Sequence, residues 1–179
     1  MMLREFIVYA CPTGAIASQL ACYFQRSRTE CGSNTAHHYM PHCTLTGFFH
    51  DDSESVPIYR NALDEALDKG RSTRPDSAIA ITALTFQSEF HYLKLDSDWI
   101  LRVVKDFSDR ARSDTRVDAL RLKGWLHLSL AYGFPPEQCL PLQRLAAEIL
   151  DMRSPAVWEL RFYERHPNNT WTCHRSWAL

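Results

Sequence analysis

The stretch Pro41-His42-Cys43-Thr44-Leu45-Thr46-Gly47-Phe48-Phe49 carries a histidine and a hydroxyl residue two positions apart within an apolar run. Successive side chains of a β-strand point to opposite faces of its sheet. His42 and Thr44 would therefore share one face, while Cys43 and Leu45 would be buried on the other. This pattern predicts a strand that presents an imidazole beside a hydroxyl group.

A second stretch repeats this pattern in the other half of the chain. In Trp125-Leu126-His127-Leu128-Ser129-Leu130-Ala131-Tyr132, His127 and Ser129 would share one face of a strand. With eight histidines in the chain, about one match to His-x-Ser/Thr is expected by chance. A third match, His174-Arg175-Ser176, is also present. The motif is therefore weak by itself, and its sequence context has to carry the argument.

That context is an internal repeat. A strand-like run at 6–10 precedes a helical stretch and the His42 strand, and a run at 90–95 precedes a helical stretch and the His127 strand. In the two units, 36 and 37 positions separate the start of the run from the motif histidine. Such a duplication would let two half-sites face each other across a pseudo-two-fold axis. His174 has no counterpart in this scheme.

The rest of the pattern predicts an α+β fold of mainly antiparallel strands with helices packed outside. Ser97 is expected to cap a helix, and Pro141 should lie in a first helical turn, because proline inside a helix would break it. The first helix should end near Gly32. We expect helices whose apolar faces lie at 16–24, 58–67, 100–107 and 145–150, and strands over 6–10, 41–49, 78–86, 90–95, 125–134, 157–163 and 171–177.

Composition limits the class of protein. A length of 179 residues fits a single domain, 1–179, that is made of two duplicated lobes. The formal net charge of −1 gives no whole-chain basic field for long nucleic acids. The six cysteines include no C-x-x-C pair, so zinc and thioredoxin-like sites lack support.

The sequence pattern predicts no targeting signal. The first apolar run is too short and too charged for a signal peptide, and no stretch approaches the roughly 18 apolar residues of a membrane span. We therefore expect a cytoplasmic chain with reduced thiols and no membrane contact. The sequence leaves the oligomeric state open.

Two histidines and two hydroxyl groups suit a particular chemistry. A neutral imidazole accepts a proton near pH 7 and an imidazolium donates one, so a facing pair can supply the base and the acid of one displacement. The hydroxyls of Thr44 and Ser129 could donate hydrogen bonds to the oxygens of a phosphoryl group. A cyclic phosphodiester is the best match. No carboxylate cluster accompanies either histidine, which disfavours a two-metal mechanism.

The paired motifs resemble those of the 2H phosphoesterase superfamily, which includes LigT-like proteins and RNA 2′,3′-cyclic phosphodiesterases. More specifically, the chain is similar to the phosphoesterase domain of the TULA/Sts proteins. The similarity covers nearly the whole chain and is most specific at 6–49 and 125–134. It is carried by Cys11-Pro12-Thr13-Gly14, Cys31-Gly32, Ala36-His37, Pro41-His42, Phe48-Phe49 and His127-Leu128-Ser129-Leu130-Ala131.

The resemblance implies a bilobal fold with a central cleft, and hydrolysis of 2′,3′-cyclic phosphates without a metal or another cofactor. Carried over by motif, His42 and His127 are the acid/base pair, and Thr44 and Ser129 bind the phosphate. Family analogy makes His127 the base and His42 the acid, although the sequence itself allows the exchange. Tyr132 would point away from His127 in a regular strand, so we leave it outside the site.

The partner implied is a small nucleotide or an RNA end, whose base requires an aromatic surface. Phe48, Tyr92 and Trp125 are the candidates for binding it, although packing in the core or the cleft wall is the commoner role of such residues. Arg165 and His166 are candidates for phosphate binding, with an ordinary exposed turn as the commoner alternative. Two other functions stay open: a nucleotide-binding module without turnover, and a tRNA-processing 2′–5′ ligase or phosphodiesterase.

Overall fold

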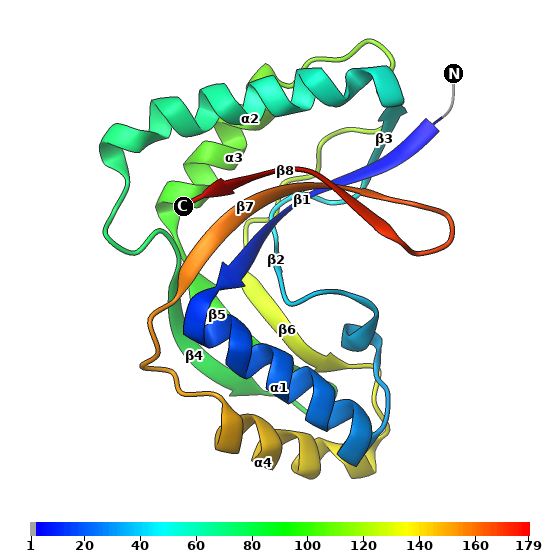
Figure 1. The fold of residues 1–179 in the computed structure, drawn as a ribbon, viewed down its shortest axis with the longest axis vertical. Helices are drawn as coiled ribbons and strands as arrows, with labels where there is room; N and C mark the ends of the chain where they lie inside the picture. Colours follow the sequence, from blue (N-terminus) through cyan, green and yellow to red (C-terminus); the bar gives the residue numbers. More distant parts are fainter. Residues whose placement is uncertain (1–2) are drawn as a thin grey trace.

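Eight strands form one continuous antiparallel sheet in the computed structural model, which describes residues 3–179. The strands are β1 (Leu3–Thr13), β2 (Cys43–Thr44), β3 (Phe49–Asp52), β4 (Ala80–Phe86), β5 (Phe90–Asp96), β6 (His127–Tyr132), β7 (Val157–Arg165) and β8 (Trp171–Ala178). Their order is β4-β5-β6-β2-β1-β7-β8, and β3 pairs with β1 beside this path. The antiparallel α+β architecture predicted from the sequence is confirmed (Figure 1).

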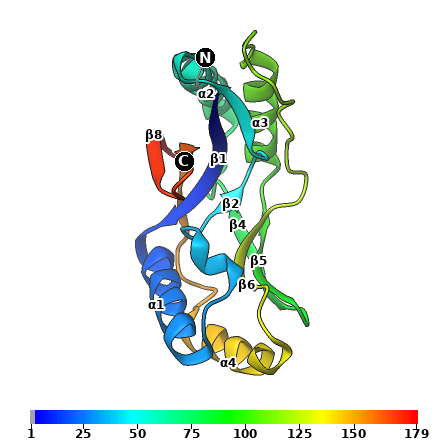
Figure 2. The ribbon, with the colours of Figure 1, turned by 90° about the vertical axis from the view of Figure 1, so that its right-hand side faces the viewer.

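Four α-helices in these residues pack as two pairs. They are α1 (Gly14–Cys31), α2 (Val56–Gly70), α3 (Asp98–Arg110) and α4 (Cys139–Ile149). Helix α1 packs against α4, and α2 packs against α3. Figures 1 and 2 show the two pairs at opposite ends of the long axis, with the sheet between them. Each pair joins one helix from each half of the chain, so the two halves interlock instead of folding side by side.

Strand β1 is buried on both faces, which explains why it is a nearly continuous apolar run. Phe6, Val8 and Ala10 point into the main core, whereas Ile7 and Tyr9 belong to a second buried cluster on the other face. All five side chains are at most 2% exposed. The second face is the one that carries the site described below.

The predicted helix ends agree with the structure. The Ser97 hydroxyl accepts a hydrogen bond from the Ile100 backbone N–H at 3.0 Å and caps α3. Gly32 follows α1 with φ of 87°, a left-handed conformation that favours glycine after a helix. Pro141 lies in the first turn of α4, where its missing N–H breaks no helical hydrogen bond.

The first motif strand is much shorter than predicted. Instead of a strand over 41–49, β2 contains only two residues, and the chain then bends before β3. The bend arises because the backbone N–H groups of Leu45 and Thr46 both donate to the carbonyl of Val8, at 3.1 and 3.4 Å. Two residues therefore oppose one on β1, which is the geometry of a β-bulge.

A buried carboxylate ties this region to the segment 111–126, which leads into β6. Asp51 on β3 is fully buried and accepts hydrogen bonds from the hydroxyls of Tyr59 on α2 and Thr115. These hydrogen bonds outweigh the effect of burial and hold the pKa of Asp51 below its ordinary value. The network anchors a segment that otherwise has little regular structure.

Replacement of Asp51 by alanine is expected to lower the free energy of unfolding by about 3 kcal/mol, because it leaves the buried Tyr59 hydroxyl without its acceptor. Chemical denaturation monitored by far-UV circular dichroism measures the change. The matched control is Asp114→Ala, at an exposed aspartate of the same segment, with an expected change below about 0.5 kcal/mol. Equal stability of the two variants would contradict the structural role of Asp51.

Candidate active site

The two motif strands pair with each other at the centre of the sheet. Cys43 on β2 lies opposite Leu128 on β6 in an antiparallel register. The neighbours on either side of this pair are then also opposed, so that Thr44 faces His127 and His42 faces Ser129. Each histidine is thus set beside the hydroxyl residue of the other motif. The two histidines are diagonal neighbours, for which a Cα separation of about 7–8 Å is typical.

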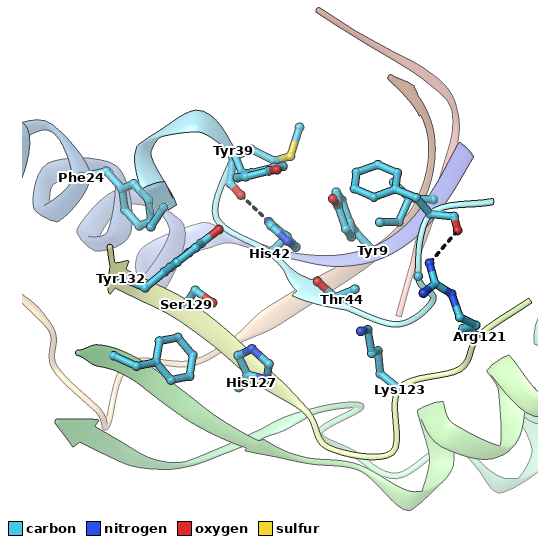
Figure 3. A pocket seen from close by; sticks show the side chains of 16 residues that line it. Tyr9, Phe24, Tyr39, His42, Thr44, Arg121, Lys123, His127, Ser129 and Tyr132 are labelled. Carbon is cyan, nitrogen blue, oxygen red and sulfur yellow. Dashed lines mark hydrogen bonds between the residues drawn. The ribbon is translucent and has the colours of Figure 1, made fainter. Parts of the chain in front are cut away.

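All four motif side chains line one pocket of about 580 Å³ (Figure 3). Cys43 and Leu128 between them are fully buried on the opposite face, as strand alternation predicted. Six aromatic residues contribute to the wall: Tyr9, Phe24, Tyr39, Phe48, Phe90 and Tyr132. The described lining residues include the cationic side chains of Arg121 and Lys123 but no Asp or Glu. The site is therefore electropositive within a chain of nearly neutral net charge.

His42 is held in one tautomer. Its Nδ1 donates a hydrogen bond to the backbone carbonyl of Met40 at 2.7 Å, which can only accept, so Nε2 is the ring nitrogen left for the pocket. The ring stacks on Tyr9, with centroids 3.9 Å apart. Burial lowers the pKa of His42 to about 4, against the opposing effect of the Met40 hydrogen bond, and the nearby His127 adds to the lowering. His42 is therefore neutral at pH 7 in the unliganded protein.

His127 has a similar aromatic support. Its ring stacks on the indole of Trp125 at 4.0 Å between centroids and meets the edge of Phe90 at 5.4 Å. Burial lowers the pKa of His127, and the positive charge of Lys123 lowers it further, while the Trp125 backbone acts in the opposite direction. Each motif histidine is thus fixed between an aromatic ring and the pocket.

The hydroxyl residues of the two motif segments have two different roles. Thr44 and Ser129 are half-buried in the pocket wall. Thr46, two positions after Thr44, is instead completely buried, and its hydroxyl accepts a hydrogen bond from the Val8 backbone N–H at 3.0 Å. The bulge after β2 turns Thr46 into the protein, so its role is structural.

Of the three predicted base-binding residues, the structure places only Phe48 in the pocket wall. Tyr92 is 7% exposed and packs edge-on against Trp125, at 5.2 Å between centroids. Trp125 is 48% exposed but lies behind the His127 ring. The two residues support the pocket wall from behind, because Trp125 turns a face of its indole to the imidazole and Tyr92 stacks on Phe90. Phe90, which the sequence pattern did not single out, lines the pocket in their place.

Tyr132 corrects a second prediction. A regular strand would point it away from His127, yet it lines the same pocket. The reason is a bulge between β5 and β6: His91 pairs with Ala131 but Tyr92 pairs with Ser129, so one extra residue, Leu130, shifts the alternation. The pKa of Tyr132 is raised by burial and by the neighbouring Tyr39 phenol. Both tyrosines line the pocket.

Arg121 and Lys123 were also missed. They lie on the irregular segment before β6, which is fastened to the bend after β2 by reciprocal backbone hydrogen bonds. Gly47 N–H donates to the Arg121 carbonyl at 2.7 Å, and Lys123 N–H donates to the Leu45 carbonyl at 3.0 Å. The Arg121 guanidinium also donates to the Phe48 carbonyl at 3.4 Å (Figure 3). The spacing of two cations directly before the second motif was the available signal.

Residues 3–179 contain neither a metal-binding cluster nor a membrane-spanning helix. No group of three or more His, Cys, Asp or Glu side chains in this part of the chain is arranged to hold a metal ion. None of its helices has both the length and the apolar character needed to cross a membrane.

The sheet, the paired helices and the two motif strands at the centre define a bilobal 2H phosphoesterase-like fold. No protein-family model matches the chain. Curated proteins do: ecdysteroid-phosphate phosphatase of Drosophila melanogaster is 32% identical, over 92% of this chain and 26% of that protein. The ecdysteroid-phosphate phosphatase of Bombyx mori is 30% identical, over 92% of this chain and 25% of its own.

Ubiquitin-associated and SH3 domain-containing protein B of Homo sapiens, a TULA/Sts protein, is 32% identical over 165 residues, or 90% of this chain and 25% of that protein. The predicted similarity to the TULA/Sts proteins is thus confirmed over most of the chain. The chain spans about a quarter of the length of these relatives. The activities in their names belong to the larger proteins.

Proposed function

We propose that the chain hydrolyses cyclic phosphodiesters, with 2′,3′-cyclic nucleotides or RNA 2′,3′-cyclic phosphate ends as substrates and with His42 and His127 as the acid/base pair. The observation that carries this proposal is the register of β2 and β6, which sets each motif histidine opposite the hydroxyl residue of the other motif. A phosphoryl group lying over this face of the sheet would meet an imidazole and a hydroxyl from each strand.

The charge of the pocket supports an anionic substrate. Arg121 and Lys123 line it, and the described lining residues carry no carboxylate. A cyclic phosphodiester bears one negative charge, which these cations attract and which the Thr44 and Ser129 hydroxyls can bind through hydrogen bonds. The aromatic wall formed by Phe48, Phe90 and the tyrosines offers surface to a ribose and a base.

The reaction balances with water as the only co-reactant. A neutral imidazole takes a proton from water as the water oxygen forms a bond to phosphorus. The bond between phosphorus and one ribose oxygen breaks, and the imidazolium on the other side gives its proton to that oxygen. The product is a nucleoside 2′- or 3′-monophosphate. The pair then holds one proton again, which has moved from one ring to the other and is restored by exchange with solvent.

The geometry of His42 indicates which histidine starts as the base. Its Nδ1 donates to the Met40 carbonyl, which leaves the Nε2 of the neutral ring free to accept a proton, and burial lowers the pKa of His42 to about 4. We therefore assign His42 as the base toward water and His127 as the acid toward the leaving oxygen. This assignment reverses the one that the family resemblance implied.

The relatives named ecdysteroid-phosphate phosphatases support phosphoester chemistry in general. The choice of a cyclic diester rests on this chain's own residues. Two opposed histidines can activate water and protonate an alkoxide in one displacement.

Turnover of a 2′,3′-cyclic nucleotide by protein treated with EDTA is the direct test. We expect full activity after dialysis against the chelator, because the proposed steps use only side chains of the pocket. Loss of activity that returns with added Mg²⁺, Mn²⁺ or Zn²⁺ would overturn the metal-independent mechanism.

Calorimetry with the same nucleotide separates the alternatives. Binding without product would favour a nucleotide-binding module. Salt-dependent binding of tRNA, with joining or cleavage of 2′–5′ linkages, would favour the tRNA-processing activity.

A further inference from the structure

A second, smaller pocket of about 250 Å³ lies beside the candidate active site. It is lined by His38, Tyr39, Arg165, Asn169 and Trp171, and Tyr39 also lines the larger pocket. Its outer wall is the hairpin of β7 and β8, whose tip projects on the side of the molecule where the short helix Thr35–His38 lies (Figure 1). The two pockets are therefore neighbouring compartments of one surface.

Trp171 connects the compartments through aromatic contacts. Its ring lies 6.0 Å from Tyr9, 6.0 Å from Tyr39 and 6.2 Å from Phe48, measured between centroids. All three contacts line the larger pocket. Trp171 is only half-buried, so this group of aromatic rings ends at an indole that a ligand can reach.

Arg165 places a positive charge beside this indole. It pairs with Trp171 across the β7–β8 ladder, and its guanidinium carbon lies 4.6 Å from the centroid of the Phe48 ring. Glu5 contacts its Nε at 2.6 Å and holds the side chain against the sheet. Neither Asp nor Glu is among the described residues that line the small pocket. An aromatic face and a guanidinium next to a phosphoester site are the elements that bind a nucleotide within a single strand.

We propose that the small pocket is a second nucleotide subsite, which takes the nucleotide that precedes a terminal 2′,3′-cyclic phosphate. Its base stacks on Trp171, and the phosphate that links it to the terminal ribose pairs with Arg165. The substrate class of the site is then an oligonucleotide 3′ end in preference to a free mononucleotide. This inference rests on the proposed function, and it predicts a preference that the larger pocket alone does not give.

The test compares a 2′,3′-cyclic mononucleotide with a dinucleotide that ends in a 2′,3′-cyclic phosphate. We expect wild-type kcat/KM to be about 10-fold higher for the dinucleotide, since stacking of one base on an aromatic side chain changes affinity by roughly this factor or more. In Trp171→Ala and Arg165→Ala the ratio of the two kcat/KM values should fall toward 1, and Trp171→Phe should restore most of it.

Arg175→Ala is the matched control, because Arg175 lies on the same hairpin but pairs with Asp64 of α2 on the other face. It should keep the wild-type ratio. Salt gives a second readout: the extra phosphate should make log kcat/KM for the dinucleotide fall more steeply with log salt, by about 0.7, and Arg165→Ala should remove this difference.

The outcomes distinguish the two proposals. Cleavage of both substrates with a ratio near 1, or with a ratio that Trp171→Ala and Arg165→Ala leave unchanged, would overturn the second subsite alone. If neither substrate is cleaved, binding of the corresponding 3′-phosphorylated mono- and dinucleotides decides. Tighter dinucleotide binding that depends on Trp171 and Arg165 would keep the subsite and reject the enzyme, and equal or no binding would reject both.

Discussion

Alanine at His42 or at His127 is expected to lower kcat for a 2′,3′-cyclic nucleotide by about 10³-fold, the middle of the range for one positioned proton transfer. Each change removes one of the two groups that move protons across the pocket, while the hydroxyls and cations that bind the substrate remain. KM should therefore change much less than kcat. Initial rates with purified protein measure both constants, and thermal melting shows whether the variant is folded.

The double variant His42→Ala/His127→Ala sharpens this test. If the histidines act in the same displacement, the second substitution should lower kcat by a much smaller factor than the first. The effects of groups that act as a unit are not additive. His174→Ala is the control, since His174 matches the same short motif but bonds Glu164 and packs on Phe162, away from the pocket. Activity close to wild type in either motif variant would remove the proposed mechanism.

The second prediction concerns pH: kcat/KM is expected to be highest below pH 6.5. The active form carries one proton on the pair. Below the pKa of His42, about 4, both rings are protonated and no base is present. Above the pKa of His127, which burial lowers from 6.5, both rings are neutral and no acid is present. Activity should therefore peak between these limits and fall about 100-fold between pH 6.5 and pH 8.5.

Comparison of the pH profiles of kcat/KM and kcat tests whether the lowered pKa values of the two histidines set the optimum. The profile of kcat/KM reports the free enzyme, whereas that of kcat reports the enzyme–substrate complex. A bound phosphate is an opposite charge that favours imidazolium, so it should raise both pKa values. The optimum of kcat is thus expected at a higher pH than that of kcat/KM. A kcat/KM optimum above pH 7 would contradict the lowered pKa values.

Much of the fold could be predicted because its signals are local. The alternation of apolar and polar residues in the motifs identified the buried side chains Cys43 and Leu128, and Ser97 capped the expected helix. These features depend on neighbours within a few residues. The similarity to the TULA/Sts proteins was equally readable, because short segments such as Pro41-His42 and His127-Leu128-Ser129 indicate it, and it extends over 90% or more of the chain.

The predictions failed where the backbone leaves regular geometry. A bulge at Leu130 turned Tyr132 into the pocket, and another after β2 ended the first motif strand early and buried Thr46. A bulge shifts strand alternation by one residue. A bulge arises from pairing with a strand that is distant in the chain. The residues around Thr44 and around Leu130 therefore contain no local signal that predicts it.

The amino-acid sequence specifies which side chains have suitable chemistry. Its motifs identified His42, Thr44, His127 and Ser129 as candidates without any coordinates. Which residues accompany them depends on contacts between segments far apart in the chain. Pairing of β2 with β6 joins the motifs, and the segment before β6 adds Arg121 and Lys123. The hairpin of β7 and β8 adds its aromatic and cationic side chains through β1. Sequence periodicity reports the face on which a residue lies, but long-range strand pairing sets what lies across from it.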